Sequence, residues 1–226
     1  MIEISNLEFQ YSDAGFRLRV PQLSISRGEK IAIVGPSGSG KTTLLMLVAG
    51  VQVAKGGTIR VGNTIISSLN DADRRRFRIA NIGLVFQELE LIEYLSVREN
   101  ILLPYLINRA MRLDASATEA ARDLAEALGM SDKLDRRPAR LSQGERQRVA
   151  ICRAMLTCPD VVLADEATGN LDSKTANAML DLLLSQVDER GATLLFVTHD
   201  HSLLDRFDRT IDLAEFDVSA LVAGNR

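Results

Sequence analysis

The stretch "IAIVGPSGSGKTTLLMLVAG", residues 31 to 50, decides the fold of this chain. It starts with a short apolar run, passes through a glycine-rich loop and ends in an apolar helical pattern. Residues 35 to 42 match the phosphate-loop motif G-x-x-x-x-G-K-[ST] in full, with the strand before and the helix after that the motif requires. A glycine-rich turn with an incidental lysine is the alternative, and both flanking elements argue against it.

Glycines in such a loop let successive backbone N–H groups approach the phosphates of a nucleotide. Lys41 would reach the β- and γ-phosphates, and the hydroxyl of Thr42 would be offered to Mg²⁺. The predicted nucleotide-binding residues of this stretch are Gly35, Pro36, Ser37, Gly38, Ser39, Gly40, Lys41, Thr42 and Thr43.

A second oxygen ligand for the metal is offered by "VVLADE", residues 161 to 166. The apolar run places Asp165 at the carboxyl end of a buried strand, which is where open α/β sheets bind ligands. We expect Asp165 to hold Mg²⁺ directly or through water. Glu166 is then free to orient or deprotonate an attacking water. The residues alone therefore predict a nucleotide-hydrolysis site.

Four apolar runs lack the alternation of half-exposed strands and so favour a parallel sheet covered on both faces. The first thirty residues alternate and predict an antiparallel edge sheet. The fold class expected is thus α/β, a phosphate-loop core of mostly parallel sheet with an antiparallel N-terminal edge sheet and an inserted helical subdomain. The four runs are "IAIVG" (31–35), "IGLVF" (82–86), "VVLAD" (161–165) and "LLFVT" (194–198).

The segment 88–158 contains helical patterns and no convincing strand. We interpret the chain as one domain, 1–226, with its core in 1–87 and 159–226 and the helical subdomain in 88–158. Within it, "DASATEAARDLAEALG" (114–129) predicts a helix with a Ser116–Glu119 capping box, a stop at Gly129 and a buried stripe. That stripe comprises Ala117, Ala121, Leu124 and Leu128.

A second phosphate-binding stretch is predicted at "LSQGERQR", residues 141 to 148. Ser142 and Glu145 have the spacing of a capping box at a helix N-terminus. Gly144 lies in the first turn, where glycine is unfavourable by about 1 kcal/mol unless something must approach the backbone. A helix tip with free N–H groups and no side chain in the way is suited to an anion.

Composition excludes several classes of protein. The chain has 226 residues and a net charge of −3, which argues against binding nucleic acid by bulk electrostatics. We take the basic run Arg74 to Arg78 as a solvated helix face.

No apolar run approaches the ~18 residues of a membrane span, and the N-terminus lacks a signal-peptide pattern. Cys152 and Cys158 fit no metal spacing, and Cys152 is expected to be a buried thiol.

With "GPSGSGKT", "LSQGERQR" and "VVLADEATGNLD" in this order, the chain resembles the ATP-binding cassette family over nearly its whole length. The resemblance implies that Tyr11 stacks on adenine and that Gln87 joins the metal and water to the helical subdomain. It also implies that Asp172 lies in the loop that crosses to a partner and that His199 contacts the γ-phosphate. Gln87 would then join Thr42 and Asp165 as a metal ligand.

The family also implies a homodimer with two copies packed head to tail. Each ATP, with Mg²⁺, would lie between the phosphate loop of one copy and the second phosphate-binding stretch of the other. The residues implied to contact the partner's nucleotide are Ser142, Gln143, Gly144 and Asp172. Two departures from the family pattern occur, Gln143 in place of a glycine and Ala167 in place of a proline; neither removes a catalytic group.

The segments "QELELIEYLSVRENILLP" (87–104) and "EATGNLD" (166–172) resemble the lipoprotein-releasing and macrolide-export branch. The implied partners are separate transmembrane permease subunits, with no membrane insertion of this chain and no nucleic acid. The chain would then be cytoplasmic and peripheral on the inner face of the membrane. Too few residues follow His199 for an appended regulatory domain. A permease-docking groove is expected at the segment that holds Leu89, Leu91, Ile92, Tyr94 and Leu95. Some of these five residues are expected in the core of the helical subdomain instead, and none is assigned individually.

The same motifs also fit other functions. An ATPase scaffold or regulator of a permease-like partner in cell division or cell-wall remodelling would carry the same motifs. An amino-acid importer has similar segments after its equivalent of Gln87. Soluble cassette ATPases of DNA repair or translation carry coiled-coil insertions or two cassettes, and the sequence shows neither.

Overall fold

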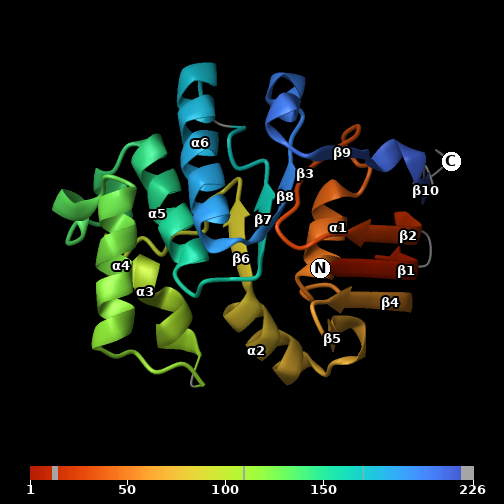
Figure 1. Ribbon diagram of the computed structural model, residues 1–226, viewed down its shortest axis with the longest axis horizontal. Coiled ribbons are helices and arrows are strands. Elements are labelled where there is room, and N and C mark those ends of the chain that lie inside the picture. Colours follow the sequence, from red (N-terminus) through yellow and green to blue (C-terminus); the bar gives the residue numbers. More distant parts are fainter. Residues whose placement is uncertain (12–14, 109, 170, 220–226) are drawn as a thin grey trace, which may run out of the picture.

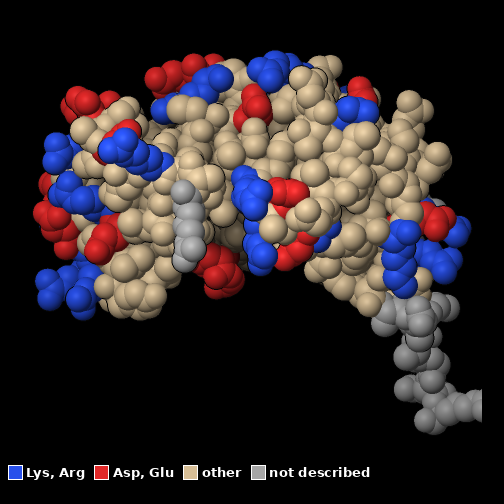
Figure 2. Space-filling model, turned by 90° about the horizontal axis from the view of Figure 1, so that it is seen from below, with Lys and Arg blue, Asp and Glu red and all other residues tan. Residues whose placement is uncertain are grey.

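The computed structural model describes residues 1–11, 15–108, 110–169 and 171–219. Its layers are arranged around a central parallel sheet, with an antiparallel sheet to one side and a group of helices to the other (Figure 1). Basic and acidic side chains are interspersed on the face drawn in Figure 2. No helix within the described ranges combines the length and the apolar character needed to cross a lipid bilayer.

The parallel sheet has the strand order β6-β7-β8-β3-β9. Four of its strands lie within one residue of the predicted apolar runs, which confirms them. The fifth, β9, was not predicted, because only Ile211 of its four residues is buried. The strands are β3 (Lys30–Val34), β6 (Ile82–Phe86), β7 (Val161–Asp165), β8 (Thr193–Val197) and β9 (Arg209–Asp212).

The carboxyl ends of these parallel strands meet at one edge of the sheet. Asp165 pairs with both Phe86 and Val197 in register, so the residues that follow the three strands start out as neighbours. The glycine-rich loop leaves the same edge after β3 and leads into α1 (Lys41–Val48). This topology gathers the predicted site residues at one edge, as expected for an open α/β sheet.

The antiparallel sheet has the order β10-β2-β1-β4-β5. Alternate residues of β1 are buried, and Ile4 lies opposite Leu23 of β2 and Ile59 of β4. These apolar side chains pack into one core with Leu44, Leu45 and Leu47 of α1, which confirms the edge sheet. Its strands are β1 (Ile2–Gln10), β2 (Arg17–Ile25), β4 (Gly56–Val61), β5 (Thr64–Ile65) and β10 (Asp217–Ser219).

Three helices fill the segment predicted to be helical, and its described residues, 88–108 and 110–158, contain no strand. They are α3 (Val97–Ile107), α4 (Ala115–Ala127) and α5 (Gln143–Met155), and they group beside the sheet, away from the antiparallel strands (Figure 1). The remaining α-helices are α2 (Asp71–Asn81) and α6 (Ser173–Arg190). Short 3₁₀ turns cover Ile66–Ser68, Ser131–Lys133, Pro138–Arg140, His201–Arg206 and Leu213–Glu215.

The N-cap residue predicted for α4 is wrong, whereas the prediction of which of its residues are buried is confirmed. Asp114 is the cap, and its Oδ1 accepts a hydrogen bond of 3.0 Å from the N–H of Ala117. Ser116 lies inside the first turn, because the helix starts two residues earlier than a Ser116 cap requires. The four residues of the predicted apolar stripe are all buried. The chain leaves the helix at Gly129 with φ +67°, as predicted.

The interpretation of Arg74 to Arg78 as a solvated face holds for only part of the run. Arg75 and Arg76 are exposed and form ion pairs with Asp71 and Asp73. Arg74 is partly buried and donates to the carbonyl of Leu69 at 2.7 Å. Arg78 donates to the carbonyl of Gly50 at 3.1 Å. These two arginines therefore connect α2 to neighbouring loops, which was not expected from their sequence.

Helix α5 lies against β6 at a contact that only glycine allows. A Cβ atom on Gly83 would lie 2.5 Å from the carbonyl oxygen of Ala154. Nearby, Cys152 is buried as predicted, with its Sγ 3.6 Å from the carbonyl of Leu124. Burial raises the pKa of the Cys152 thiol to about 12, so it stays protonated. Cys158 is exposed.

Candidate active site

The glycine-rich loop adopts backbone conformations that require glycine. Gly38 has φ +79° and Gly40 has φ +91°. A Cβ on Gly40 would also lie 2.6 Å from Cζ of Phe16, so the ring of Phe16 covers the base of the loop. The loop therefore turns tightly enough to direct its backbone toward the cavity that it borders.

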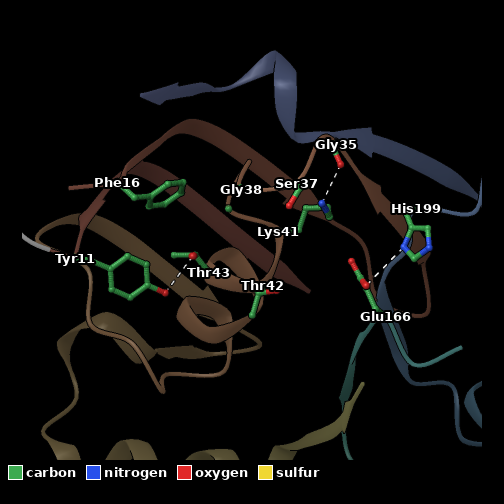
Figure 3. A pocket seen from close by; sticks show the side chains of 11 residues that line it. Tyr11, Phe16, Gly35, Ser37, Gly38, Lys41, Thr42, Thr43, Glu166 and His199 are labelled. Atoms are coloured by element: carbon green, nitrogen blue, oxygen red, sulfur yellow. Dashed lines mark hydrogen bonds and ion pairs between the residues drawn. The ribbon is translucent and has the colours of Figure 1, made fainter. Parts of the chain in front are cut away.

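Lys41 lies at the start of α1 and its side chain folds back over the loop (Figure 3). Its Nζ donates to the carbonyls of Gly35 at 2.9 Å and Pro36 at 3.0 Å. Lys41 is buried, and these carbonyls compensate its charge. The ammonium is thus held beside the place where the motif predicts the phosphates.

A cavity of about 560 Å³ opens in front of this loop. Most of the predicted nucleotide-binding residues line it, together with Glu166 and His199. Pro36 and Ser39 do not: Pro36 contributes its carbonyl to Lys41, and the side chain of Ser39 is buried behind the loop. The lining residues are Tyr11, Phe16, Gly35, Ser37, Gly38, Gly40, Lys41, Thr42, Thr43, Glu166 and His199.

Two aromatic rings form one wall of the cavity. Tyr11 is exposed over about half of its surface, and its hydroxyl lies 3.2 Å from Oγ1 of Thr43. Phe16 was not predicted; its ring centroid lies 6.0 Å from that of Tyr11. A backbone hydrogen bond from the N–H of Tyr11 to the carbonyl of Phe16 holds the two side by side. Phe16 could have been found from the sequence, because one aromatic residue follows the first predicted strand and another precedes the second.

Asp165 ends β7 and is not among the residues that line the cavity. Thr42 donates a side-chain hydrogen bond to its carboxylate. Its Oδ1 is buried and has no hydrogen-bond partner among the described residues. Burial raises the pKa of Asp165, opposed by the Thr42 hydrogen bond, with the nearby charge of Glu166 raising it further. A buried carboxylate oxygen without a partner, beside a hydroxyl, is the donor set that Mg²⁺ prefers.

Glu166 follows β7 with φ +46°, a conformation unusual for a residue with a side chain. Its N–H donates to the carbonyl of Val197 at 3.1 Å, which fixes the turn against β8. The Oε2 atom lies 3.6 Å from Nδ1 of His199 (Figure 3). The strained turn directs the carboxylate into the cavity instead of along the strand.

Gln87 does not line the phosphate-loop cavity. It borders a smaller cavity of about 280 Å³ that Gln143 and Arg146 of α5 also line. Its amide nevertheless lies beside Gly169, which also neighbours the backbone of Glu166 and the ring of His199; this was not predicted. A Cβ on Gly169 would lie 3.3 Å from the carbonyl of Glu166, 3.6 Å from Nε2 of Gln87 and 3.7 Å from Cε1 of His199.

The second phosphate-binding stretch starts α5 with the predicted capping box. Oγ of Ser142 accepts from the N–H of Glu145 at 3.3 Å, and Oε2 of Glu145 accepts from the N–H of Ser142 at 2.8 Å. Gly144 leaves the helix tip open, with a Cβ only in ordinary contact with Thr175. Asp172 caps α6 and faces the same space.

The two phosphate-binding stretches are separate within one chain. Ser142, Gln143, Gly144 and Asp172 line a cavity of about 550 Å³ that includes no residue of the glycine-rich loop. Leu171, beside Asp172, also belongs to this cavity, while Asn170 of the "NLD" motif lies outside the described residues. Within one chain, the predicted site residues therefore lie mainly around two cavities, one in front of the glycine-rich loop and one at the tip of α5.

The five residues around which a docking groove is expected differ in exposure. Leu89 is buried in the core and Tyr94 is exposed, and Leu89 and Leu91 also line the small cavity of Gln87. A separate apolar cavity of about 470 Å³ lies between α2, β6, α3 and α5. We call it the α2–α3 groove. Its lining residues are Arg75, Arg78, Ile79, Ile82, Gly83, Leu84, Phe86, Glu90, Leu103, Pro104, Ile107, Arg153, Ala154 and Thr157.

Solved structures with this architecture are similar over the whole chain. The structure titled "Dimeric Structure of MJ0796, a Bacterial ABC Transporter Cassette" has a TM-score of 0.83 and 30% identity, covering 99% of this chain and all of that one. A second MJ0796 structure, titled as a dimeric post-hydrolysis state bound to ADP and Pi, has a TM-score of 0.82 and 28% identity over the same shares.

Curated relatives and a family model agree with these structures. The lipoprotein-releasing system ATP-binding protein LolD of Hydrogenovibrio crunogenus is 41% identical over 95% of this chain and 94% of its own length. The uncharacterized ABC transporter ATP-binding protein YbbA of Escherichia coli K12 is 43% identical over 85% of this chain and 83% of its own length. The family model described as ABC transporter matches residues 18–169. This chain belongs to the ABC transporter family, as one of its ATP-hydrolysing nucleotide-binding subunits.

Proposed function

We propose that two copies of this chain pack head to tail around two ATP molecules and drive a separate membrane permease of the export or mechanotransmission type. One observation carries this proposal: Ser142 and Lys41 line different cavities of one chain. A phosphate held by Lys41 therefore meets the tip of α5 only if a second copy supplies it. The MJ0796 structures are titled as dimeric, which supports a pair of copies.

In this proposal each copy is a single domain, with residues 88–158 as a helical subdomain that carries the tip of α5. The tip offers free N–H groups and the Ser142 hydroxyl to the partner's γ-phosphate. Each hydrogen bond to a charged group contributes about 1.5–3 kcal/mol. Several such bonds at two sites would favour the closed dimer while ATP is bound, and hydrolysis would remove them.

Hydrolysis is assigned to the groups around the loop cavity. Glu166 orients the attacking water and accepts its proton, because its strained turn directs the carboxylate into the cavity. His199 lies beside Glu166 and is exposed to the same space, where it would contact the γ-phosphate. Lys41 exchanges its bonds to the loop carbonyls for bonds to the β- and γ-phosphates.

Thr42 and Asp165 would hold Mg²⁺, and the unpartnered Oδ1 of Asp165 supports this assignment. When bound, the ion would neutralise charge on the phosphates. Gln87 would become a third ligand only through a movement toward the loop, since it borders a different cavity. The pairing of Phe86 with Asp165 places Gln87 and Asp165 at the ends of neighbouring strands, which supports such a movement.

The rate of hydrolysis per molecule tests the shared site. If a site needs two copies, the specific ATPase activity rises with protein concentration until dimerisation saturates. The measurement is the ATPase rate of the purified chain over a wide dilution series at saturating Mg²⁺ and ATP. A rate per molecule that is independent of dilution, at full activity, would show that one copy holds a complete site.

The permease is proposed to dock in the α2–α3 groove, which leaves this chain on the cytoplasmic face of the membrane without inserting into it. The groove is mainly apolar and reaches the exposed residue Ile107 at the end of α3. The LolD relatives, named as ATP-binding proteins of a lipoprotein-releasing system, support a permease of that branch.

Capture from detergent-solubilised membranes of the source cells tests the docking surface. Tagged wild-type chain is expected to retain an integral membrane protein, identified by mass spectrometry. Leu103→Asp is expected to lose it, because the charge enters the apolar groove. The control is Tyr94→Asp, an exposed side chain outside the groove. Equal retention by both variants would contradict this docking site.

A further inference from the structure

The turn that follows β6 is strained at two consecutive residues. Leu89 has φ +47° and Glu90 has φ +48°, and neither is glycine. Left-handed conformations cost energy for residues with side chains, and two in a row persist only when the surroundings enforce them. Gln87 belongs to this turn, so whatever enforces the turn also places Gln87.

One side chain contacts both strained residues. Arg153 of α5 donates from Nη2 to the carbonyl of Leu89 and from Nη1 to the carbonyl of Glu90, each at 2.6 Å. The two donors of a guanidinium have a fixed separation and orientation, so they fit this pair of carbonyls only in the observed backbone conformation. Burial lowers the pKa of Arg153, yet a guanidinium remains charged at neutral pH.

The turn separates two cavities that the proposed function uses. Glu90 lines both the α2–α3 groove and the small cavity of Gln87. Arg153 lines the groove side. The guanidinium thus lies between the proposed docking surface and the backbone that carries Gln87, and it touches neither the loop cavity nor the tip of α5.

We infer that Arg153 is a positioning residue for hydrolysis, which holds Leu89 and Glu90 in their left-handed conformations and thereby sets the place of Gln87. The inference rests on the proposed role of Gln87 in the reaction. It differs from a purely structural role in one respect. Loss of Arg153 should slow the chemical step while nucleotide binding at the loop is unchanged, because no contact of Arg153 reaches the loop.

Arg153→Met tests the inference against a matched control. The control, Arg74→Met, also removes a partly buried arginine. Arg74 donates to the backbone carbonyl of Leu69 and pairs with Asp71, and in the described part of the chain no hydrogen bond or ion pair joins it to residues 87–90. We expect Arg153→Met to lower kcat by about tenfold or more, since small misplacements of catalytic groups have effects of this size. Its KM and its affinity for ATP should stay within about twofold of wild type. Arg74→Met should leave kcat within about twofold.

Hydrogen exchange and a rescue variant separate positioning from general destabilisation. Amide exchange in peptides covering 87–91 should accelerate in Arg153→Met and not in Arg74→Met. Glycine adopts the left-handed region without cost, so adding Glu90→Gly to Arg153→Met should restore kcat by about threefold or more. If Arg153→Met does not fold, Arg153→Lys is measured instead, with the same direction expected for kcat and exchange.

Three results would overturn the inference. They are an unchanged kcat in the Arg153 variant, a loss of kcat that follows the thermal destabilisation of both arginine variants alike, or no gain from Glu90→Gly. Failure of the proposed function looks different. In that case the wild-type chain would not hydrolyse ATP, or Glu166→Gln would hydrolyse it normally, whatever the behaviour of the Arg153 variants.

Discussion

Nδ1 of His199 lies 3.6 Å from Oε2 of Glu166, at the ends of the neighbouring strands β8 and β7. The pairing of Asp165 with Val197 brings the two chain segments together, and the strained backbone of Glu166 directs its carboxylate toward the imidazole. Both side chains line the loop cavity. A carboxylate and an imidazole therefore face the same cavity, in front of the glycine-rich loop.

Replacing Glu166 with Gln should abolish turnover and leave ATP binding intact. Glutamine has nearly the same shape but cannot accept the proton of the attacking water, and loss of such a base costs about 10²–10⁴-fold in rate. With ATP and Mg²⁺ the variant should elute as a dimer in size-exclusion chromatography, and with ADP as a monomer. Normal hydrolysis by this variant would show that another group activates the water.

Replacing Ser142 with Phe should lower the ATPase rate without weakening ATP binding by the dilute monomer. The bulky ring blocks the tip of α5, which lines a cavity remote from the glycine-rich loop. Ser116→Phe is the matched control, because Ser116 is exposed in the first turn of α4 and outside both cavities. A parallel loss of rate and monomer affinity in Ser142→Phe would place the stretch in its own chain's site.

Replacing Gly169 with Ala should lower kcat several-fold, on the order of 1 kcal/mol in the barrier. The added methyl group would crowd the carbonyl of Glu166 and approach the side chains of Gln87 and His199. Gly56→Ala adds the same methyl group to a strand with only ordinary contacts, and serves as the control. An unchanged kcat in Gly169→Ala would mean that these three groups tolerate displacement.

Replacing Glu145 with Ala should destabilise the protein at neutral pH and have little effect in acid. The hydrogen bond from the backbone N–H of Ser142 lowers the pKa of Glu145 below its ordinary 4.5, with smaller help from the Ser142 hydroxyl and Lys133. A lowered folded-state pKa means that the stabilisation is present above the unfolded value and is lost as pH falls through the folded one. The difference in unfolding free energy between wild type and variant, measured by urea denaturation, should be about 1 kcal/mol at pH 7. It should shrink in acid, and a difference that grows in acid would contradict the assignment.

The sequence predicted best what depends on neighbouring residues. The glycine-rich loop, the four buried strands and the Ser142–Glu145 box each lie within one short stretch, so spacing alone defines their geometry. The cap of α4 was misplaced because Asp114 and Ser116 both suit a helix start, and only the packing of the helix decides between them. Strand β9 was not predicted because it is short and mostly exposed, so it has no apolar run.

What the sequence did not predict comes from contacts between distant segments. Phe16, just before β2, lies against Gly40 of the loop, and Gly169 lies beside Gln87 and His199, which follow two other strands. Arg78 contacts Gly50 through the placement of α2, which no local pattern encodes. The α2–α3 groove was not predicted for the same reason, since its walls come from four separate elements.

Helix α5 contacts β6 closely at one point, where Ala154 lies against Gly83. Ala154 lies near one end of the helix and Ser142 caps the other, about 18 Å away at 1.5 Å per residue. A tilt of only about 10° at this contact would swing the Ser142 end by about 3 Å, a full hydrogen-bond length. A small tilt of α5 where it crosses β6 would therefore become a larger displacement at the surface that a second copy is proposed to meet.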